Sequence, residues 1–141
     1  MSQPLRLEAD DAEDLTVIAA CLQDALVLVG DMAFLPEEQR FVLVANRFVW
    51  EAAAHEDGEA YARTSAGLSF DKVAAVKQRN LDRSQTDAIL SLLTIRQLPG
   101  AIELVFSGEA VIRLETNEVQ CHLADLGETW PTRWRPQHAL D

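Results

Sequence analysis

Three side chains near the C-terminal end of the sequence could bind a metal ion. Glu118, His122 and Asp125 are spaced i, i+4 and i+7, which places them on one face of a helix. Imidazole and carboxylate groups are ligands of zinc and similar ions, so a small metal-dependent or hydrolytic enzyme centred on this helix is one hypothesis. The interpretation we favour is a solvated helix face with a Glu118–His122 pair, because the sequence indicates no further ligand.

Arginines on expected strands form a second candidate site, one for a small anionic ligand. The candidate residues are Arg47, Arg63 and Arg96. A guanidinium group binds a carboxylate or phosphate through two parallel hydrogen bonds. Arg47 shares one face of its strand with Val49 and Glu51, and Phe48 and Trp50 share the other. We therefore expect the aromatic face in the core and the charged face in cross-strand ion pairs, with ligand binding as the alternative.

The C-terminal tail concentrates tryptophan, arginine and proline. Its candidate partner-binding residues are Trp130, Arg133, Trp134 and Arg135. Tryptophan and arginine are enriched among the residues that dominate binding energy at interfaces. We expect residues 128–141 to pack irregularly over the domain, because exposed tryptophans are costly in a monomer. The alternative is that the tail docks to a partner or to a second copy of the chain.

The other potentially reactive residues are scattered. Cys121 and His122 are adjacent, so on a helix their side chains point about 100° apart and cannot form a thiolate–imidazolium pair. The acidic segment 55–59 lacks the ligand spacing of a calcium loop and is expected to be a solvated loop. The sequence has no phosphate-binding, nucleophile-elbow or zinc-protease motif. We therefore expect no cofactor and favour a non-enzymatic role.

Composition indicates one acidic globular domain. The chain has 141 residues, 48% of them hydrophobic, with 23 acids and 12 Lys or Arg, for a net charge of −11. That charge repels nucleic acids and anionic membranes, and we expect neither as a partner. The only local excess of bases comprises Lys72, Lys77, Arg79 and Arg83. With two cysteines and no expected secretory signal or membrane span, we expect free thiols in a cytoplasmic protein.

Hydrophobic periodicity predicts a helix at each end of the chain and strands between them. The first helix is expected over residues 11–23, with acids in its first turn. A second helix is expected from Thr116 or Asn117 to Gly127, a residue that favours a helix C-cap. The expected strands are 26–29 and 32–35 with a bulge at Gly30, then 40–51, 62–70, 89–98, 101–107 and 110–115, with 73–79 either strand or helical turn.

Short strands joined by turns predict antiparallel pairing. The expected fold is therefore α+β within a single domain of residues 1–141: about seven antiparallel strands with an N-terminal and a C-terminal helix. This element order resembles a pleckstrin-homology-like barrel, in which the last helix plugs one end. The rival is an open antiparallel sheet with both helices on one face.

Five motifs together resemble one family. They are Asp-Ala-Glu-Asp-Leu at 11–15, Leu-Gln-Asp-Ala at 22–25, Asn-Arg-Phe-Val-Trp-Glu at 46–51, Leu-Ser-Phe-Asp-Lys-Val at 68–73 and Leu-Ala-Asp-Leu-Gly at 123–127. The chain resembles an uncharacterised bacterial domain-of-unknown-function family of small stand-alone proteins. The resemblance implies no assigned activity and transfers no catalytic residue. Our leading hypothesis is a small binding or assembly domain that holds a protein partner, or another copy of itself, through an exposed sheet edge, the Arg47 strand or the tail.

Overall fold

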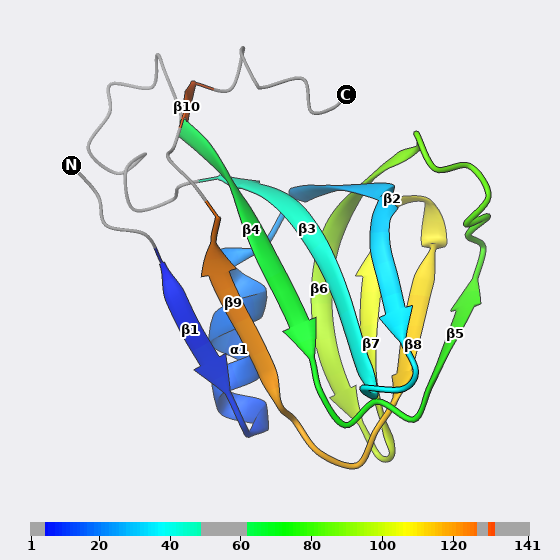
Figure 1. The fold of residues 1–141 in the computed structure, drawn as a ribbon. Coiled ribbons are helices and arrows are strands. Elements are labelled where there is room, and N and C mark those ends of the chain that lie inside the picture. Colours follow the sequence, from blue (N-terminus) through cyan, green and yellow to red (C-terminus); the bar gives the residue numbers. More distant parts are fainter. Residues whose placement is uncertain (1–4, 49–61, 127–129, 132–141) are drawn as a thin grey trace.

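The computed structural model describes residues 5–48, 62–126 and 130–131. Within these ranges the chain forms one α-helix, one short 3₁₀ turn and ten strands (Figure 1). In chain order they are β1 (Arg6–Ala9), α1 (Ala12–Cys21), β2 (Ala25–Leu35), β3 (Arg40–Phe48), β4 (Ala62–Phe70), β5 (Ala75–Arg79), β6 (Ile89–Leu98), β7 (Ala101–Phe106), η1 (Ser107–Glu109), β8 (Val111–Glu115), β9 (Cys121–Asp125) and β10 (Trp130–Pro131).

All the strands belong to one antiparallel sheet. Its order is β1-β9-β4-β3-β2-β6-β7-β8-β5, and β10 adds to the free part of β4. The sheet is curled, so that β1, β9, β4 and β3 lie in front of β6, β7 and β8 (Figure 1). Apolar residues of both halves form one core cluster, among them Phe41, Leu68, Leu104 and Ile112. The inner faces of the two halves therefore pack against each other.

Strand β2 joins the two halves because it pairs with β3 on one side and β6 on the other. Its register with β3 shifts between Val27 and Met32, which confirms the bulge expected at Gly30. A Cβ atom at Gly30 would lie 2.9 Å from the carbonyl oxygen of Thr86, to which the Gly30 N–H donates. Only glycine permits this close approach without a shift of the backbone.

Helix α1 covers the remaining side of the core. Asp11 caps it, because its Oδ1 accepts a 2.8 Å hydrogen bond from the N–H of Asp14. Leu15 and Ile18 are buried, and the helix lies against β1 and β6. The expected N-terminal helix is thus present, slightly shorter than predicted. Among the described residues, no helix has the length and apolar character needed to cross a membrane.

The predicted C-terminal helix is wrong, and so is the fold class that depended on it. Residues 121–125 form β9, which lies between β1 and β4. Thr116, expected to cap a helix, closes a turn instead, since its Oγ1 accepts from the N–H of Glu118. Strand β1 was not anticipated. The structure is a largely β, open sheet with β1 and β5 at its ends, rather than a seven-stranded α+β fold or a closed barrel.

The other expected strands correspond to β2, β3, β4, β6, β7 and β8, and residues 75–79 are strand rather than helical turn. The described part of the predicted 40–51 strand ends at Phe48. The acidic segment 55–59, expected to be a solvated loop, lies outside the described residues.

Candidate functional site

The outer side of β3, β4 and β9 carries a shallow apolar hollow. Along one row of the sheet, Val44 pairs with Gly67, which pairs with Ala124. Because Gly67 has no side chain, the side chain of Leu126 packs close to its backbone, and both residues line a groove of about 340 Å³. Val42 and Leu126 complete its apolar lining. We call these five residues the outer apolar face.

Exposure distinguishes this face from the rest of the surface. The strongly exposed large hydrophobic side chains among the described residues are Val17, Leu35, Val44, Ile89, Leu93 and Leu126. Val44 and Leu126, which are 37% and 59% exposed, belong to the outer apolar face, and strand alternation places Leu35 on the same side of the sheet. Three of the six side chains thus lie on one side of the sheet, and two of them line the hollow, whereas Val17 lies on α1 and Ile89 and Leu93 lie on β6.

A polar rim borders the hollow at one end. The Nδ1 of His122 lies 3.9 Å from the Oε2 of Glu8, and its Nε2 lies 3.8 Å from the Oδ2 of Asp71. Arg40 holds Asp71 in place, since its Nε donates to the Oδ1 of Asp71 at 2.8 Å. His122 is half-exposed and lines the groove. This rim could orient a polar group of a ligand above an apolar floor.

The predicted metal residues are not brought together. Because the segment is a strand, His122 and Asp125 point to opposite faces of the sheet, His122 outward and Asp125 inward. Glu118 is exposed in the turn before β9. Among the described residues, the one cluster of carboxylates with metal-like spacing is Asp10, Asp11 and Asp14, all exposed beside the start of α1. Asp11 there already caps the helix.

Arg47 lies in the core rather than on the outer face, which corrects the predicted orientation of β3. It follows Phe41, Leu43 and Ala45 on the buried side of the strand, and its side chain is 1% exposed. Its Nε and Nη2 donate to the two carboxylate oxygens of Asp125, each at 2.9 Å. The buried residues of β3 alternate from Phe41 onward, and this alternation continues to Arg47. Phe48 therefore lies on the outer face, where it is half-buried.

The three candidate arginines do not form a common anion site. The Nη1 of Arg63 donates to the backbone and side-chain oxygens of Asn46, and its guanidinium lies 3.8 Å from the centre of the Phe48 ring. Arg96 lies on the other half of the sheet and donates twice to Glu103. Each of these arginines is thus engaged within the fold.

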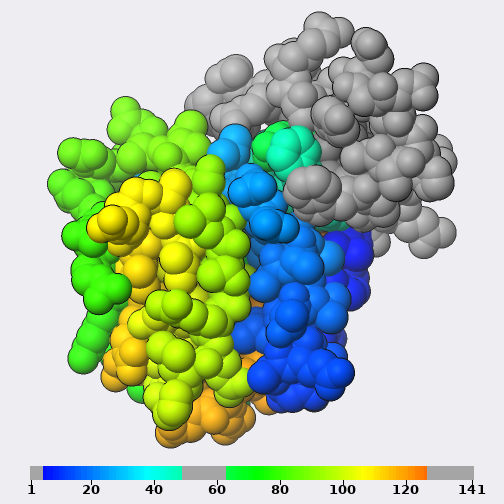
Figure 2. All heavy atoms as spheres, turned by 180° about the vertical axis from the view of Figure 1, so that it is seen from behind, coloured from blue at the N-terminus to red at the C-terminus, as the bar shows by residue number. Residues whose placement is uncertain are grey.

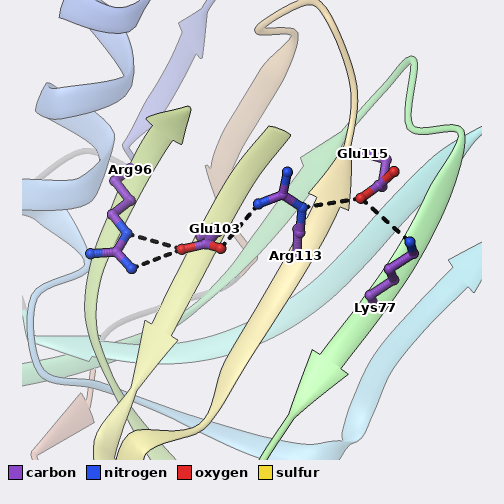
Figure 3. A network of polar contacts seen from close by, with 5 residues as sticks. All are labelled: Lys77, Arg96, Glu103, Arg113 and Glu115. Carbon is purple, nitrogen blue, oxygen red and sulfur yellow. Dashed lines mark hydrogen bonds and ion pairs between the residues drawn. The ribbon is translucent and has the colours of Figure 1, made fainter. Parts of the chain in front are cut away.

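A ladder of charges crosses the outer side of β6, β7, β8 and β5 (Figure 3). We call it the charge ladder, and its members in order are Arg96, Glu103, Arg113, Glu115 and Lys77. Glu103 lies nearly buried between the two arginines. Their hydrogen bonds, Arg96 foremost, lower the pKa of Glu103. The ladder is internally paired, as a cross-strand stabilising network is expected to be.

Cys121 provides no activated nucleophile. Burial, reinforced by the negative charge of Asp71, raises the pKa of Cys121 to about 12. Its thiol faces the core beside Leu123 on the inner side of β9. Cys21 is half-buried at the end of α1, and the two cysteines form no disulfide, as expected. The adjacent Cys121 and His122 point to opposite faces, so they form no catalytic pair.

The tail residues Arg133, Trp134 and Arg135 lie outside the described residues. The backbone of Trp130 is paired with Arg63 at the end of β4. The outer apolar face was missed from the sequence, although one signal was present. Val42 and Val44 alternate with the buried residues of β3, so the strand is apolar on both faces. That pattern indicates a strand covered on both sides, or one with an exposed binding face.

Comparison with known proteins supports the resemblance seen in the sequence. Neither a curated protein nor a solved structure matches the chain. A family model described as "Protein of unknown function (DUF2948)" matches residues 5–138. The chain therefore belongs to the DUF2948 family, whose function is unknown.

Proposed function

We propose that the protein is a non-enzymatic binding domain that holds a partner protein on its outer apolar face. The observation that carries the proposal is the clustering of exposed Val44 and Leu126 around the hollow over Gly67. Exposed apolar patches with a polar border are typical of protein interaction sites. An aliphatic side chain of the partner would fill the hollow, and the rim at His122 and Asp71 would meet its polar groups.

The charge of the chain favours a different protein over a second copy. Two copies would each carry a net charge of −11, which opposes self-association. The face itself has little charge to offset that repulsion, because its lining includes Asp31 and His122 but is otherwise mostly aliphatic. A partner with an apolar contact and a lower or opposite net charge would approach without this penalty.

The same geometry argues against chemistry at this site. The ring nitrogens of His122 are 3.8 and 3.9 Å from the nearest carboxylate oxygens, beyond hydrogen-bond distance. The carboxylate nearest the core, that of Asp125, is occupied by Arg47 on the opposite side of the sheet. A general acid or base would need a nucleophile or a positioned water partner. Ser69 is the one hydroxyl that lines the groove, and it lies opposite His122 in the register of β4 and β9, but among the described residues the two form no hydrogen bond.

Photo-crosslinking in cells tests the proposal. A photoreactive phenylalanine derivative replaces Asp31, an exposed residue of β2 that lines the groove, and in a control chain it replaces Thr16 on α1. We expect one protein to crosslink at Asp31 but not at Thr16. Val44→Lys should abolish the adduct, because it places a charge beside the hollow, whereas Val17→Lys, on the 51% exposed Val17 of α1, should leave it unchanged.

Two outcomes would contradict the proposal. An adduct that survives Val44→Lys would mean that the contact does not use the outer apolar face. An adduct between two copies of the chain would replace the proposed partner with a homodimer. Circular dichroism of both lysine variants checks that loss of the adduct does not come from unfolding.

A further inference from the structure

The second surface of interest is the free edge of β5. This strand ends the sheet order, and among the described residues its only strand partner is β8. It lies at the margin of the molecule in both views, at the right of Figure 1 and, in green, at the left of Figure 2. An end strand has backbone N–H and C=O groups on its outer side that no neighbouring strand satisfies, so it can accept a further strand.

The side chains of β5 alternate in chemistry across its two faces. Lys77 and Arg79 are exposed on the face of the charge ladder. Val76 and Gln78 point to the other side, where Val76 packs half-buried against the core and Gln78 is exposed. A strand added beside β5 would continue both patterns, because residues opposite each other in a sheet share a face.

The positive charge of this edge is only partly neutralised. The Nζ of Lys77 lies 3.9 Å from the Oε2 of Glu115, which Arg113 also contacts at 3.0 Å. Within the described part of the chain, Arg79 forms no ion pair. Lys72, in the turn that leads to β5, is exposed as well. These residues belong to the one local excess of bases in a chain of net charge −11.

We propose that β5 binds an extended segment of a partner protein in which acidic residues alternate with apolar residues. The acidic side chains would lie opposite Lys77 and Arg79, and the apolar ones would extend the core beside Val76. The main-chain hydrogen bonds of the new strand supply the affinity, and the alternation supplies the register.

The same bases keep two copies of the chain apart at this edge. Pairing β5 with the β5 of a second copy would place lysine and arginine side chains of like charge on one face, which is unfavourable. An acidic strand would instead place opposite charges on that face, which is favourable. The bases of β5 therefore disfavour self-assembly and at the same time favour an oppositely charged partner.

A labelled peptide of alternating glutamate and valine, seven residues long, is the probe for fluorescence anisotropy with the full chain. The double variant Lys77→Glu, Arg79→Glu should weaken binding by about tenfold or more. Its neutral counterpart, Lys77→Gln, Arg79→Gln, should weaken binding less. The control is Arg6→Glu, a single charge reversal on β1 at the other end of the sheet, which should leave the affinity unchanged; its equal in charge change is the single variant Lys77→Glu, which should weaken binding.

Companion probes separate pairing from charge alone. A peptide with proline in place of each valine keeps the acidic charge but loses every second backbone N–H and the valine side chains, so it should bind much more weakly. In amide NMR spectra, the glutamate–valine peptide should shift the signals of residues 75–79 and spare those of β1. Binding should persist in Val44→Lys, since the outer apolar face is a separate surface; this result keeps the two proposals distinguishable.

Three results would overturn the inference. The peptide could fail to bind, or the proline peptide could bind equally well, which would reduce the effect to nonspecific charge. A single-stranded oligonucleotide of equal charge could bind more tightly than the peptide at the same bases. That last result would assign the edge to nucleic acid instead.

Discussion

At the residue scale, the buried contact between Arg47 and Asp125 stands out. Arg47 on β3 reaches Asp125 on β9 across β4, over the small residues Thr64 and Ala66. The Oδ2 of Asp125 also accepts from the N–H of Leu5, and the Nη1 of Arg47 donates to the carbonyl of Phe48. Such a pair is tolerated in a core because its geometry is bidentate and further hydrogen bonds satisfy it.

Removing one member of this buried pair should strongly destabilise the folded state. Asp125→Ala leaves the Arg47 guanidinium buried without its carboxylate, so we expect it to lower the free energy of unfolding by about 3–5 kcal/mol. Urea denaturation followed by circular dichroism measures the loss. Arg47→Met, Asp125→Leu should recover much of it, because no uncompensated charge then remains.

The matched control is Asp71→Ala, which removes the carboxylate of the exposed Arg40–Asp71 pair. Its effect should be much smaller, since the Arg40 side chain is 44% exposed and water replaces the lost contact. Equal losses in Asp125→Ala and Asp71→Ala would show that burial of the Arg47 pair has no energetic consequence.

At the element scale, the segment 116–126 explains why part of the fold escaped prediction. Val119, Leu123 and Leu126 have helical spacing, but Val119, Cys121 and Leu123 have strand spacing, and the latter three are the buried ones. Local pattern does not choose between these periods. The choice is made by pairing with β1 and β4, which lie over 110 and about 55 residues away in the register, and no local signal reports those partners.

The candidate site was predictable only where the strands that form it were predictable. Strands β3, β4, β6, β7 and β8 were predictable because each has its own alternation and turns. The outer apolar face needs β9 to supply Ala124 and Leu126 beside Gly67, so it could not be found while that segment was expected to be a helix. Likewise, ion pairs were expected on a charged outer face that includes Arg47, whereas Arg47 pairs in the core with an acid from the same misassigned strand.

The charge ladder makes the second half of the sheet sensitive to acid. The pKa of Glu103 is lowered from its ordinary value of 4.5, so its ionised form is favoured in the folded state. The resulting stabilisation is present above that value and is lost as the pH falls through the lower folded-state pKa. Glu103→Gln should therefore unfold at modestly lower urea concentration than the parent at pH 7, and the difference should shrink toward pH 3.

Glu118→Gln is the control for this prediction, because Glu118 is exposed and forms no ion pair among the described residues. It should change the urea midpoint little at either pH. If the urea midpoint of Glu103→Gln stays as far below that of the parent at pH 3 as at pH 7, the variant has lost packing rather than charge pairing.

At the scale of the whole molecule, negative charge and apolar surface are distributed unevenly. Much of the acid lies in residues 1–40, around α1 and the turns of β2, whereas the bases of β5 and the ladder lie on the other half of the sheet. This asymmetry leaves an uncharged outer apolar face and a basic free edge on one strongly acidic domain. The outer apolar face thus differs from the rest of the surface by its lack of charge, and the edge of β5 differs from it by its positive charge.

The net charge also predicts how the fold responds to salt. A charge of −11 on a compact chain repels itself more strongly than on the expanded unfolded chain, so screening should favour the folded state. Raising NaCl from about 0.05 M to about 0.5 M shortens the screening length several-fold and should raise the urea midpoint at pH 7. The same change at about pH 5, close to the sequence pI of about 4.6, should have little effect because the repulsion is then weak. A midpoint that falls with salt at pH 7 would mean that the local pairs, Arg96–Glu103 and Arg113–Glu115 among them, outweigh the self-repulsion of the whole chain.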